Sequence, residues 1–293
     1  MPAMRLDRLE TLVAIAEEGT FEAAARRLHL TPSAVSQRVR ALEREAGRVL
    51  VRRGTPCVVT PAGEPLLRLG RQVRLLEEET ARTLTGGAIE LAVAVNADSL
   101  ATWLRDALGE VAGWADVGLR LSVEDQVYSH GLLRRGEVSA AVTSEPEPVQ
   151  GCAVEPLGRM RYTPAATPAL VEAYRLGRGV DWARMPVVVF NEKDHLQHEV
   201  LAAHGVERPR VVHRVPSSAD FHEAVRRGLG WGMLLDPQLA PDLAAGVVRR
   251  LPGAAPVDVP LHWQRWRLDS PLLDRLSDAV RRAARAHLRR PRG

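Results

Sequence analysis

Two adjacent glycines, Gly86 and Gly87, separate two stretches of the chain that follow different hydrophobic periods. Before them, apolar side chains recur at the spacing of helix faces. After them, an apolar run at residues 89–95 opens a series in which strand patterns alternate with helix patterns. A 293-residue chain with this change of pattern is predicted to combine an α-helical head with an α/β body.

The composition excludes several classes of protein. Hydrophobic residues make up 45% and charged residues 26%, which is ordinary for a globular protein and excludes a disordered chain. No apolar run approaches the roughly 20 residues of a membrane span, and the first residues lack the apolar core of a secretion signal. Two cysteines, Cys57 and Cys152, are too few for a disulfide framework. We therefore expect a cytoplasmic protein without a membrane partner.

The basic residues gather in the head. From Arg26 to Arg74 the chain has 11 Arg and three acidic residues, whereas residues 89–274 have 19 basic and 24 acidic side chains. A basic head before a mildly acidic body favours a polyanionic partner for the head. Seven more Arg follow from Arg275 to the end, and a solvated helix face alone could account for them.

Residues 1–60 have the pattern of a winged helix-turn-helix. Helices are predicted at residues 7–18, from residue 21 and from residue 32, with Thr20 and Thr31 as N-caps. Strands predicted at residues 49–51 and 57–60 would form a wing with a basic tip.

The third helix carries polar side chains opposite its apolar face. In the major groove, Gln can pair with adenine and Arg with guanine, while nearby side chains hold the phosphates. The predicted DNA contacts are Thr31, Ser33, Ser36, Gln37, Arg38, Arg40, Arg52 and Arg53. The alternative is a three-helix bundle whose polar face is only solvated.

The head resembles the winged helix-turn-helix of LysR-type transcriptional regulators. The resemblance rests on AARRLHLTPSAVS, LEREAGRVLVRR and TPAG, in this order and spacing, and covers about the first 85 residues. It implies that the third helix and the wing contact double-stranded promoter DNA, with RNA polymerase as a further partner.

Residues 61–87 are predicted to form a linker helix and a hinge. Apolar and small side chains follow a heptad seam at Ala62, Leu66, Leu69, Val73, Leu76 and Thr80. In the resembled family this helix pairs two subunits, so we expect a homodimer or homotetramer. The alternative is a helix that packs only on its own domain.

The body is expected to be an α/β effector domain with a largely parallel sheet. Strands are predicted at residues 89–95, 117–123, 138–142, 187–190 and 211–215, and helices from residue 99 and at 128–135, 194–204, 217–228 and 271–290. The resemblance implies two lobes, as in periplasmic solute-binding proteins. Residues 88–293 would divide into lobe I, at about 88–161 and 267–293, and lobe II, at about 162–266.

The segments LAVAVNADSLATWL, LRRGEVSAAVTSE and VVVFNEKDHLQH resemble the subgroup that controls basic amino-acid export. The resemblance implies L-lysine or L-arginine as the effector, without a further cofactor. Helix N-termini bind carboxylates, and acidic side chains at carboxyl strand ends bind amines. The candidates for the effector carboxylate are therefore the helix starts at Asp98 and Ser99 and at Ser217 and Ser218. The candidates for the amines are Glu124, Asp125 and Asp194.

These candidate residues could also have purely structural roles. Asp98, Ser99, Ser217 and Asp194 could be helix caps, and the Glu124 and Asp125 pair could be a solvated loop. Asp194, His195 and His198 stand at helical spacing, which is more typical of surface decoration than of a metal site.

The functional alternatives are an architectural or replication-related DNA-binding protein and a LysR-type regulator with a different effector. No P-loop, GxSxG or HExxH motif is present, so an enzyme has little support.

Overall fold

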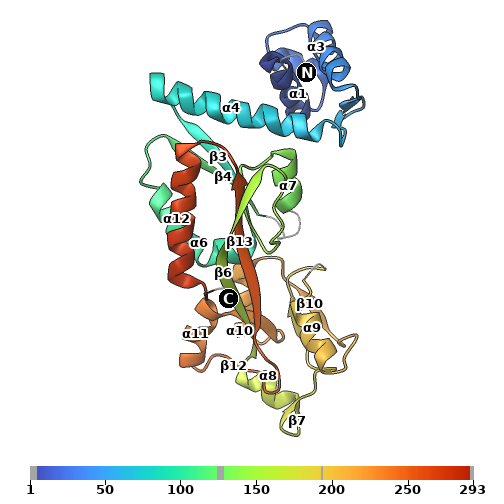
Figure 1. Cartoon of the computed structure of the whole chain (residues 1–293). Coiled ribbons are helices and arrows are strands. Elements are labelled where there is room, and N and C mark those ends of the chain that lie inside the picture. Colours follow the sequence, from blue (N-terminus) through green and yellow to red (C-terminus); the bar gives the residue numbers. More distant parts are fainter. Residues whose placement is uncertain (1–4, 124–128, 193, 291–293) are drawn as a thin grey trace. The chain divides into compact units, whose positions relative to one another are not determined.

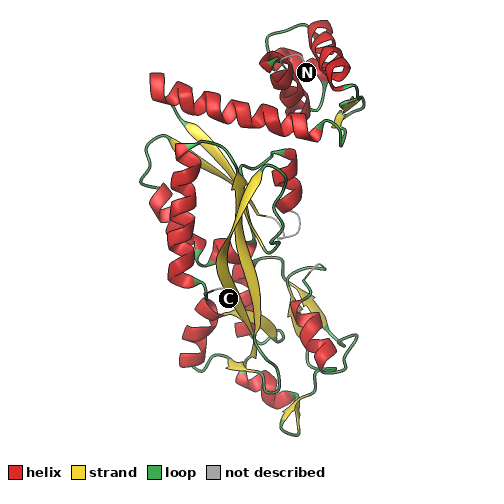
Figure 2. Ribbon diagram, viewed as in Figure 1, coloured by secondary structure: helices red, strands yellow, loops and turns green. Residues whose placement is uncertain are grey.

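The computed structural model describes residues 5–123, 129–192 and 194–290 (Figure 1). Three helices and a two-stranded wing come first, a long helix follows, and strands then alternate with helices (Figure 2). Within the described residues, no helix is both long and apolar enough to cross a membrane. The fold class is as predicted, with an α-helical winged head ahead of an α/β body.

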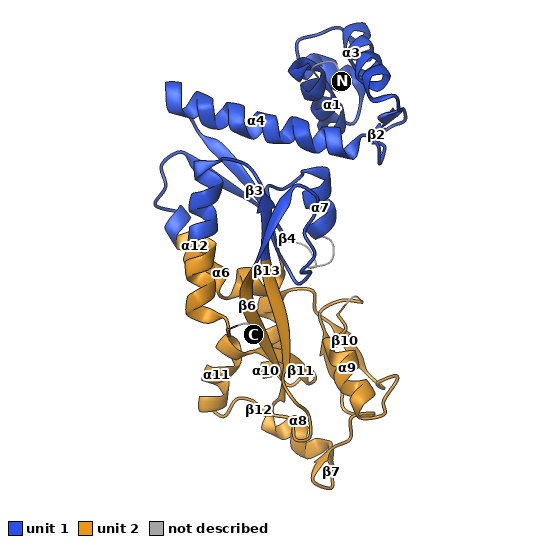
Figure 3. Ribbon diagram, viewed as in Figure 1, with its two compact units in different colours: residues 1–95, 110–155, 263–278 blue, residues 96–109, 156–262, 279–293 orange. Residues whose placement is uncertain are grey.

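The chain forms two compact units (Figure 3). Unit 1 comprises residues 1–95, 110–155 and 263–278, and unit 2 comprises residues 96–109, 156–262 and 279–293. The predicted domains divide the chain at residues 60, 87, 161 and 266 instead, and those boundaries stay a prediction.

Each helix of the head is capped by the residue that the sequence predicts. The helices are α1 (Leu6–Glu18), α2 (Phe21–Arg27) and α3 (Pro32–Ala46). Gly19 ends α1 with a φ of 72°, a left-handed conformation that favours glycine. The side chains of Thr20 and Thr31 accept hydrogen bonds from backbone N–H groups in the first turns of α2 and α3. The caps determine where each helix begins or ends, and one apolar face of each helix is buried in a shared core.

The wing is shorter than predicted. Strands β1 (Val51–Arg52) and β2 (Val58–Val59) pair antiparallel, with Arg52 opposite Val58. The predicted strand at residues 49–51 begins later because the backbone N–H groups of Leu50 and Val51 donate to the Glu43 carboxylate, at 2.9 and 3.4 Å. The Glu43 side chain therefore ties the start of the wing to α3.

Helix α4 (Glu64–Thr85) packs closely on α1 through one face. A Cβ at Gly70 would lie 2.8 Å from Cγ2 of Val13, so the two helices approach at a point that only glycine allows. Leu67 and Leu75 are the other apolar buried residues of α4.

The residues of the predicted heptad seam differ from the buried residues of α4. Leu69 is 39% exposed, and Leu66, Val73 and Leu76 are half-buried. The helix therefore packs on its own head with one set of residues and leaves the seam incompletely covered.

The body has a mixed sheet rather than the largely parallel one expected. In unit 1, β3 (Ile89–Val95) lies between β4 (Val117–Val123) and β5 (Ala140–Thr143), with both pairs parallel. Two long strands, β6 (Cys152–Ala166) and β13 (Val257–Trp266), are absent from the prediction, and each has residues in both units. In unit 2, β6 pairs antiparallel with β11 (Gly232–Leu235) and β12 (Arg249–Arg250).

The remaining elements are short apart from the last helix. In unit 2, β9 and β10 form a separate parallel pair, and β7 and β8 form a hairpin. The elements are α5 (Ala97–Ala101), α6 (Leu104–Val111), α7 (Ser129–Arg135), α8 (Pro168–Ala173), β7 (Arg175–Leu176), β8 (Gly179–Val180), β9 (Val187–Val189), α9 (Leu196–Ala203), β10 (Val212–Arg214), α10 (Ser218–Arg226), α11 (Asp236–Ala244) and α12 (Pro271–His287).

A cluster of charges around Glu17 adds to the apolar contact between α1 and α4. The Glu17 carboxylate accepts two hydrogen bonds from Arg74 of α4, at 2.9 and 3.0 Å, and one from Arg27 of α2, at 2.7 Å. Burial alone would raise the pKa of Glu17, but the hydrogen bonds from Arg74 and Arg27 and the nearby guanidinium charges outweigh it and lower the pKa to about 2. Folding therefore favours the ionised form of this side chain.

We predict that Glu17→Gln lowers the free energy of unfolding at pH 7 by about 1 to 3 kcal/mol. Since the folded pKa is lowered to about 2, the contribution is complete above the ordinary carboxyl pKa and is lost as the pH falls toward 2. Urea unfolding of the full chain at pH 7 and at pH 3, followed by circular dichroism, measures the difference at each pH. The control is Glu10→Gln, an exposed position on the same helix. Equal stability of Glu17→Gln and wild type at pH 7 would contradict the role of the cluster.

Candidate DNA-binding surface and effector site

Helix α3 presents the predicted base-reading side chains to solvent. Ser33, Gln37 and Arg40 are exposed, and Ser36 is half-buried. On the opposite side of the helix, three apolar side chains are buried in the core of the head: Val35, Val39 and Leu42. Their burial fixes the rotation of α3, so the polar face points outward as a major-groove reader requires.

The Arg38 side chain contacts another residue of the head, whereas the Arg40 side chain is exposed. Its guanidinium donates to the backbone oxygen of Asp7 at 3.3 Å and lies 3.5 Å from the Asp7 carboxylate. Arg38 therefore ties α3 to α1, and only part of its side chain remains available to DNA.

The other predicted DNA contacts lie on the cap and the wing. Thr31 is the N-cap of α3, and its hydroxyl also lies 2.9 Å from that of Ser33. Arg52 is exposed on β1. The Arg53 guanidinium lies over the ring of Phe21, 4.6 Å from its centre, and this contact holds the tip of the Arg53 side chain beside α2.

In unit 2, three segments far apart in sequence converge on the carboxylate of Asp98. One oxygen accepts a hydrogen bond from the Ser218 hydroxyl at 2.7 Å, and the other accepts one from the Tyr162 hydroxyl at 2.8 Å. Asp98 lies on α5, Tyr162 on β6 and Ser218 in the first turn of α10. The structure thus brings together Asp98 and Ser218, which the sequence predicted separately.

Asp98 is a carboxylate in a poorly solvated setting. Burial raises its pKa, the hydrogen bonds from Ser218 and Tyr162 lower it, and the nearby charge of Asp194 raises it, with a net shift upward. A cation bound here would stabilise the ionised form. The site therefore suits an ammonium or guanidinium group.

Further polar atoms beside Asp98 in the chain lack partners. Ser99 is completely buried and Asn96 is 5% exposed, and within the described residues neither Oγ of Ser99 nor Oδ1 of Asn96 has a hydrogen-bond partner. Gln197 on α9 is likewise buried, with Oε1 unpartnered in that same part of the chain. Buried polar atoms rarely lack a hydrogen-bond partner, because each unsatisfied one destabilises the folded state by roughly 1–3 kcal/mol.

Two of the predicted residues accept backbone hydrogen bonds at the starts of helices, and one of them is an N-cap. Ser217 is the N-cap of α10 and accepts from the N–H of Asp220 at 3.4 Å. The Asp194 carboxylate accepts from the N–H groups of Phe190 and Leu196, at 2.9 and 3.2 Å, and so joins the end of β9 to the start of α9. Asp194 contributes its charge to the surroundings of Asp98 rather than a hydrogen bond.

Helix α5 begins at Ala97, two residues before the predicted start at Ser99. Asp98 and Ser99 therefore lie inside its first turn rather than at the cap. The predicted pair Glu124 and Asp125 lies outside the described residues.

Sequence reasoning missed Tyr162, which contacts Asp98, and Asn96, which stands beside it in the chain. Asn96 follows β3 directly, so the carboxyl-end rule that selected Glu124 and Asp125 would have selected it too. Tyr162 lies in the strand that the prediction lacked, and no local signal pointed to its contact with Asp98.

The histidines of α9 do not form a metal cluster with Asp194. Nδ1 of His198 lies 3.0 Å from the backbone oxygen of Asp194 rather than from its carboxylate. Across the described ranges of the chain, no group of three or more His, Cys, Asp or Glu side chains could hold a metal ion.

Comparison with known proteins assigns both parts of the chain to one family. Residues 6–64 match the family described as "Bacterial regulatory helix-turn-helix protein, lysR family", and residues 85–285 match the "LysR substrate binding domain". The "Lysine export transcriptional regulatory protein LysG" of Corynebacterium efficiens is 51% identical over 285 residues, 96% of this chain and 98% of that protein.

Two solved structures resemble the whole chain. The full-length LysG of Corynebacterium glutamicum with bound effector Arg has a TM-score of 0.89 at 49% identity, covering 98% of this chain and 100% of that one. ArgP from Mycobacterium tuberculosis has a TM-score of 0.90 at 43% identity, covering 99% and 100%. This chain therefore belongs to the lysR family of bacterial helix-turn-helix regulators, in the group that contains LysG and ArgP.

Proposed function

We propose that this protein is a transcriptional regulator that binds promoter DNA through α3 and the wing, binds L-lysine or L-arginine in its body, and controls a basic amino-acid exporter gene. The observation that carries the effector assignment is the carboxylate of Asp98, held by two hydroxyls beside unpartnered buried polar atoms. Relatives named for lysine export and a similar structure with arginine bound support the same class of ligand.

The effector would be bound by residues predicted from the sequence together with Tyr162. Asp98 and Ser218 would contact it directly, with Ser99 as a further polar group. Ser217 would support the site as the N-cap of α10, and Asp194 by accepting from the N–H of Leu196 at the start of α9. Glu124 and Asp125 remain proposed ligands of the amines, on the sequence alone.

Some of the proposed contacts would read DNA bases, and the others would hold the head on the phosphates. Gln37 and Arg40 would read bases, because both are exposed on the open face of α3. Thr31, Ser33, Ser36, Arg38, Arg52 and Arg53 would position the head on the phosphates. A regulator that binds promoter DNA would act in the cytoplasm, with RNA polymerase as a partner.

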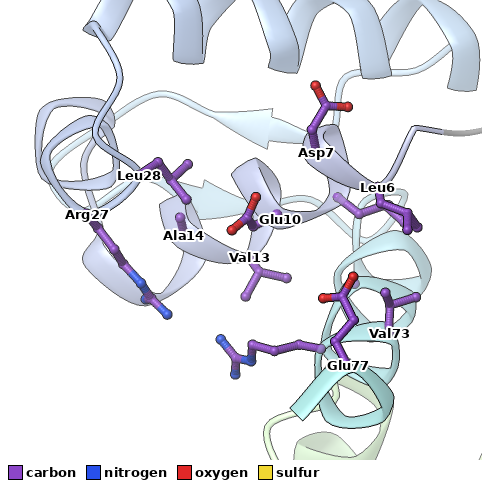
Figure 4. A pocket seen from close by; sticks show the side chains of 12 residues that line it. Leu6, Asp7, Glu10, Val13, Ala14, Arg27, Leu28, Val73 and Glu77 are labelled. Carbon is purple, nitrogen blue, oxygen red and sulfur yellow. The ribbon is translucent and has the colours of Figure 1, made fainter. Parts of the chain in front are cut away.

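The linker helix would pair two copies of the chain. Its seam residue Leu69 is 39% exposed and Leu84 is 77% exposed. A groove of about 320 Å³ runs between α1 and α4, lined by apolar side chains such as Val13, Leu28 and Val73 and rimmed by charged ones such as Glu77 (Figure 4). An amphipathic helix of a second copy would cover these positions.

We expect Arg40→Ala and Gln37→Ala each to lower affinity for a specific duplex about tenfold or more, since each removes one base contact. The duplex is selected from a random pool by the wild-type protein, and affinity is measured by fluorescence anisotropy. Arg178→Ala, an exposed arginine in unit 2, serves as the control. If binding of the selected duplex survives both α3 variants unchanged, α3 is not the reader.

L-Lysine and L-arginine should raise the melting temperature of the full chain, whereas L-leucine and L-glutamate should not. A ligand at 100 times its dissociation constant stabilises the folded state by about 2.7 kcal/mol, which a thermal melt detects readily. If neither L-lysine nor L-arginine raises the melting temperature, the protein is not a sensor of basic amino acids. It would then be a DNA-binding regulator with a different effector.

Leu69→Glu should shift the protein toward the monomer in sedimentation velocity, because a charge in the seam would be buried on pairing. The matched control is Leu176→Glu, an exposed leucine in unit 2. If Leu69→Glu forms a dimer or tetramer with the same dissociation constant as wild type, the seam is not the interface.

A further inference from the structure

The side chain of Gln264 is fully buried and joins three segments of unit 1. Its Oε1 accepts a hydrogen bond from the backbone N–H of Val149 at 3.1 Å. Its Nε2 lies 2.8 Å from the backbone oxygen of Glu147, 3.2 Å from that of Glu145 and 2.8 Å from Nε2 of His130. Gln264 therefore holds the loop after β5 and the first turn of α7 near the end of β13.

The backbone groups decide which way the amide of Gln264 faces. A carbonyl oxygen can only accept a hydrogen bond, and a backbone N–H can only donate one. Nε2 of Gln264 must therefore face the two carbonyl oxygens, and Oε1 must face the N–H of Val149. An amide turned the other way round would place oxygen against oxygen and N–H against N–H.

This orientation requires His130 to accept a hydrogen bond. Nε2 of Gln264 is only a donor, so Nε2 of His130 must lack a proton, and the neutral ring must carry its proton on Nδ1. A proton on Nε2 would put two donors 2.8 Å apart and place a positive charge beside a buried amide. The contact can therefore exist only while His130 is neutral.

We propose that His130 and Gln264 form an acid-sensitive anchor, which is closed while His130 is neutral and opens when its Nε2 takes up a proton. On opening, the first turn of α7 separates from β13 and from the loop after β5. The last turn of α7 contacts the linker helix α4, where Arg71 donates to the backbone oxygen of Arg135 at 2.8 Å. Protonation of His130 thereby changes the order of a helix that reaches from β13 to α4.

Burial and charge together favour the neutral ring. Burial lowers the pKa of His130, the carboxylate of Glu145 raises it and the guanidinium of Arg134 lowers it, with a net shift downward. Among the residues that the structure describes, the charges that act on the ring come from Glu145 and Arg134. The anchor is therefore closed at neutral pH.

Other charged side chains around α7 have different contacts. Glu64 and Arg71 of α4 contact the last turn of α7, away from the ring. Glu90 of β3 is exposed and paired with the neighbouring strand β4, and the side chain of Glu147 is also exposed. Strand β5 has only Ala, Val and Thr side chains. Acid therefore acts on the contact through His130 itself.

Hydrogen–deuterium exchange of the full chain tests the anchor in peptides that cover α7 and the loop after β5. Wild type and His130→Gln are compared at about pH 7.5 and about pH 5.5, with rates corrected for the intrinsic effect of pH. In His130→Gln an amide oxygen replaces the ring nitrogen as the acceptor but cannot titrate. On acidification, protection should fall up to about tenfold more in wild type, the limit for one proton at one pH unit below the ordinary histidine pKa of about 6.5.

The direction of this effect follows from the lowered pKa of His130. The open state takes up a proton more readily than the closed state. The contribution of the anchor is therefore complete above the ordinary histidine pKa and is lost as the pH falls toward the folded value.

The controls separate titration of His130 from other effects of acid. His195→Gln, at an exposed position of unit 2, should keep the wild-type response to pH. His130→Leu removes both the acceptor and the titration, so protection should be lower at both pH values and change no further in acid. Each protein is compared with itself at two pH values, so a lower overall stability of a variant leaves the comparison intact. Equal changes of protection in wild type and His130→Gln would overturn the anchor.

A second measurement needs no variant. Exchange of the histidine C2 hydrogens, followed by mass spectrometry across a pH series, gives the pKa of each histidine in the wild-type chain. His130 should titrate below about 6.5. A value at or above about 6.5 would mean that the folded protein accepts the protonated ring, and it would also overturn the anchor.

Discussion

The carboxylate of Asp98 is the interaction on which the proposed effector site depends. It joins α5 to β6 and α10, because it accepts hydrogen bonds from the hydroxyls of Tyr162 and Ser218. Two neutral donors only partly replace water around a charge, which is why burial keeps its pKa raised. In the proposed function, a cationic ligand would supply the missing compensation at Asp98. Ligand binding would then be coupled to the local order of the three segments.

The head depends on a different constraint, the two faces of α4. One face meets α1 at Gly70, where the helices approach too closely for any side chain. Glu17 adds charge pairs with Arg74 and Arg27, which join α1, α2 and α4. The reading helix α3 is packed on the same core, so its orientation follows that of α4. In the proposed dimer, the seam of α4 would carry this orientation of α3 over to both subunits.

The sequence predicts best where local chemistry decides the structure. Gly19, Thr20 and Thr31 mark the helix ends of the head correctly, because a cap depends only on its own turn. Strands β6 and β13 escaped prediction because Pro156, Gly158 and Pro260 interrupt their pattern while long-range pairing holds them. Asp98 is selected by the sequence as part of a helix start that would bind a carboxylate, whereas its burial and acceptor role suit a cation. The contact of Asp98 with Tyr162 could not be predicted, since 64 residues separate them in the chain.

Control of a gene by an effector requires that effector binding and DNA binding be coupled, and reciprocal titrations test this coupling most directly. Affinity for the selected duplex is measured with and without saturating L-arginine, and L-arginine affinity is measured with and without the duplex. Linkage requires both affinities to change by the same factor, because one ligand shifts an equilibrium that the other also biases. The account predicts a matched change together with an altered footprint on the duplex. Identical affinities and an identical footprint in all conditions would contradict it.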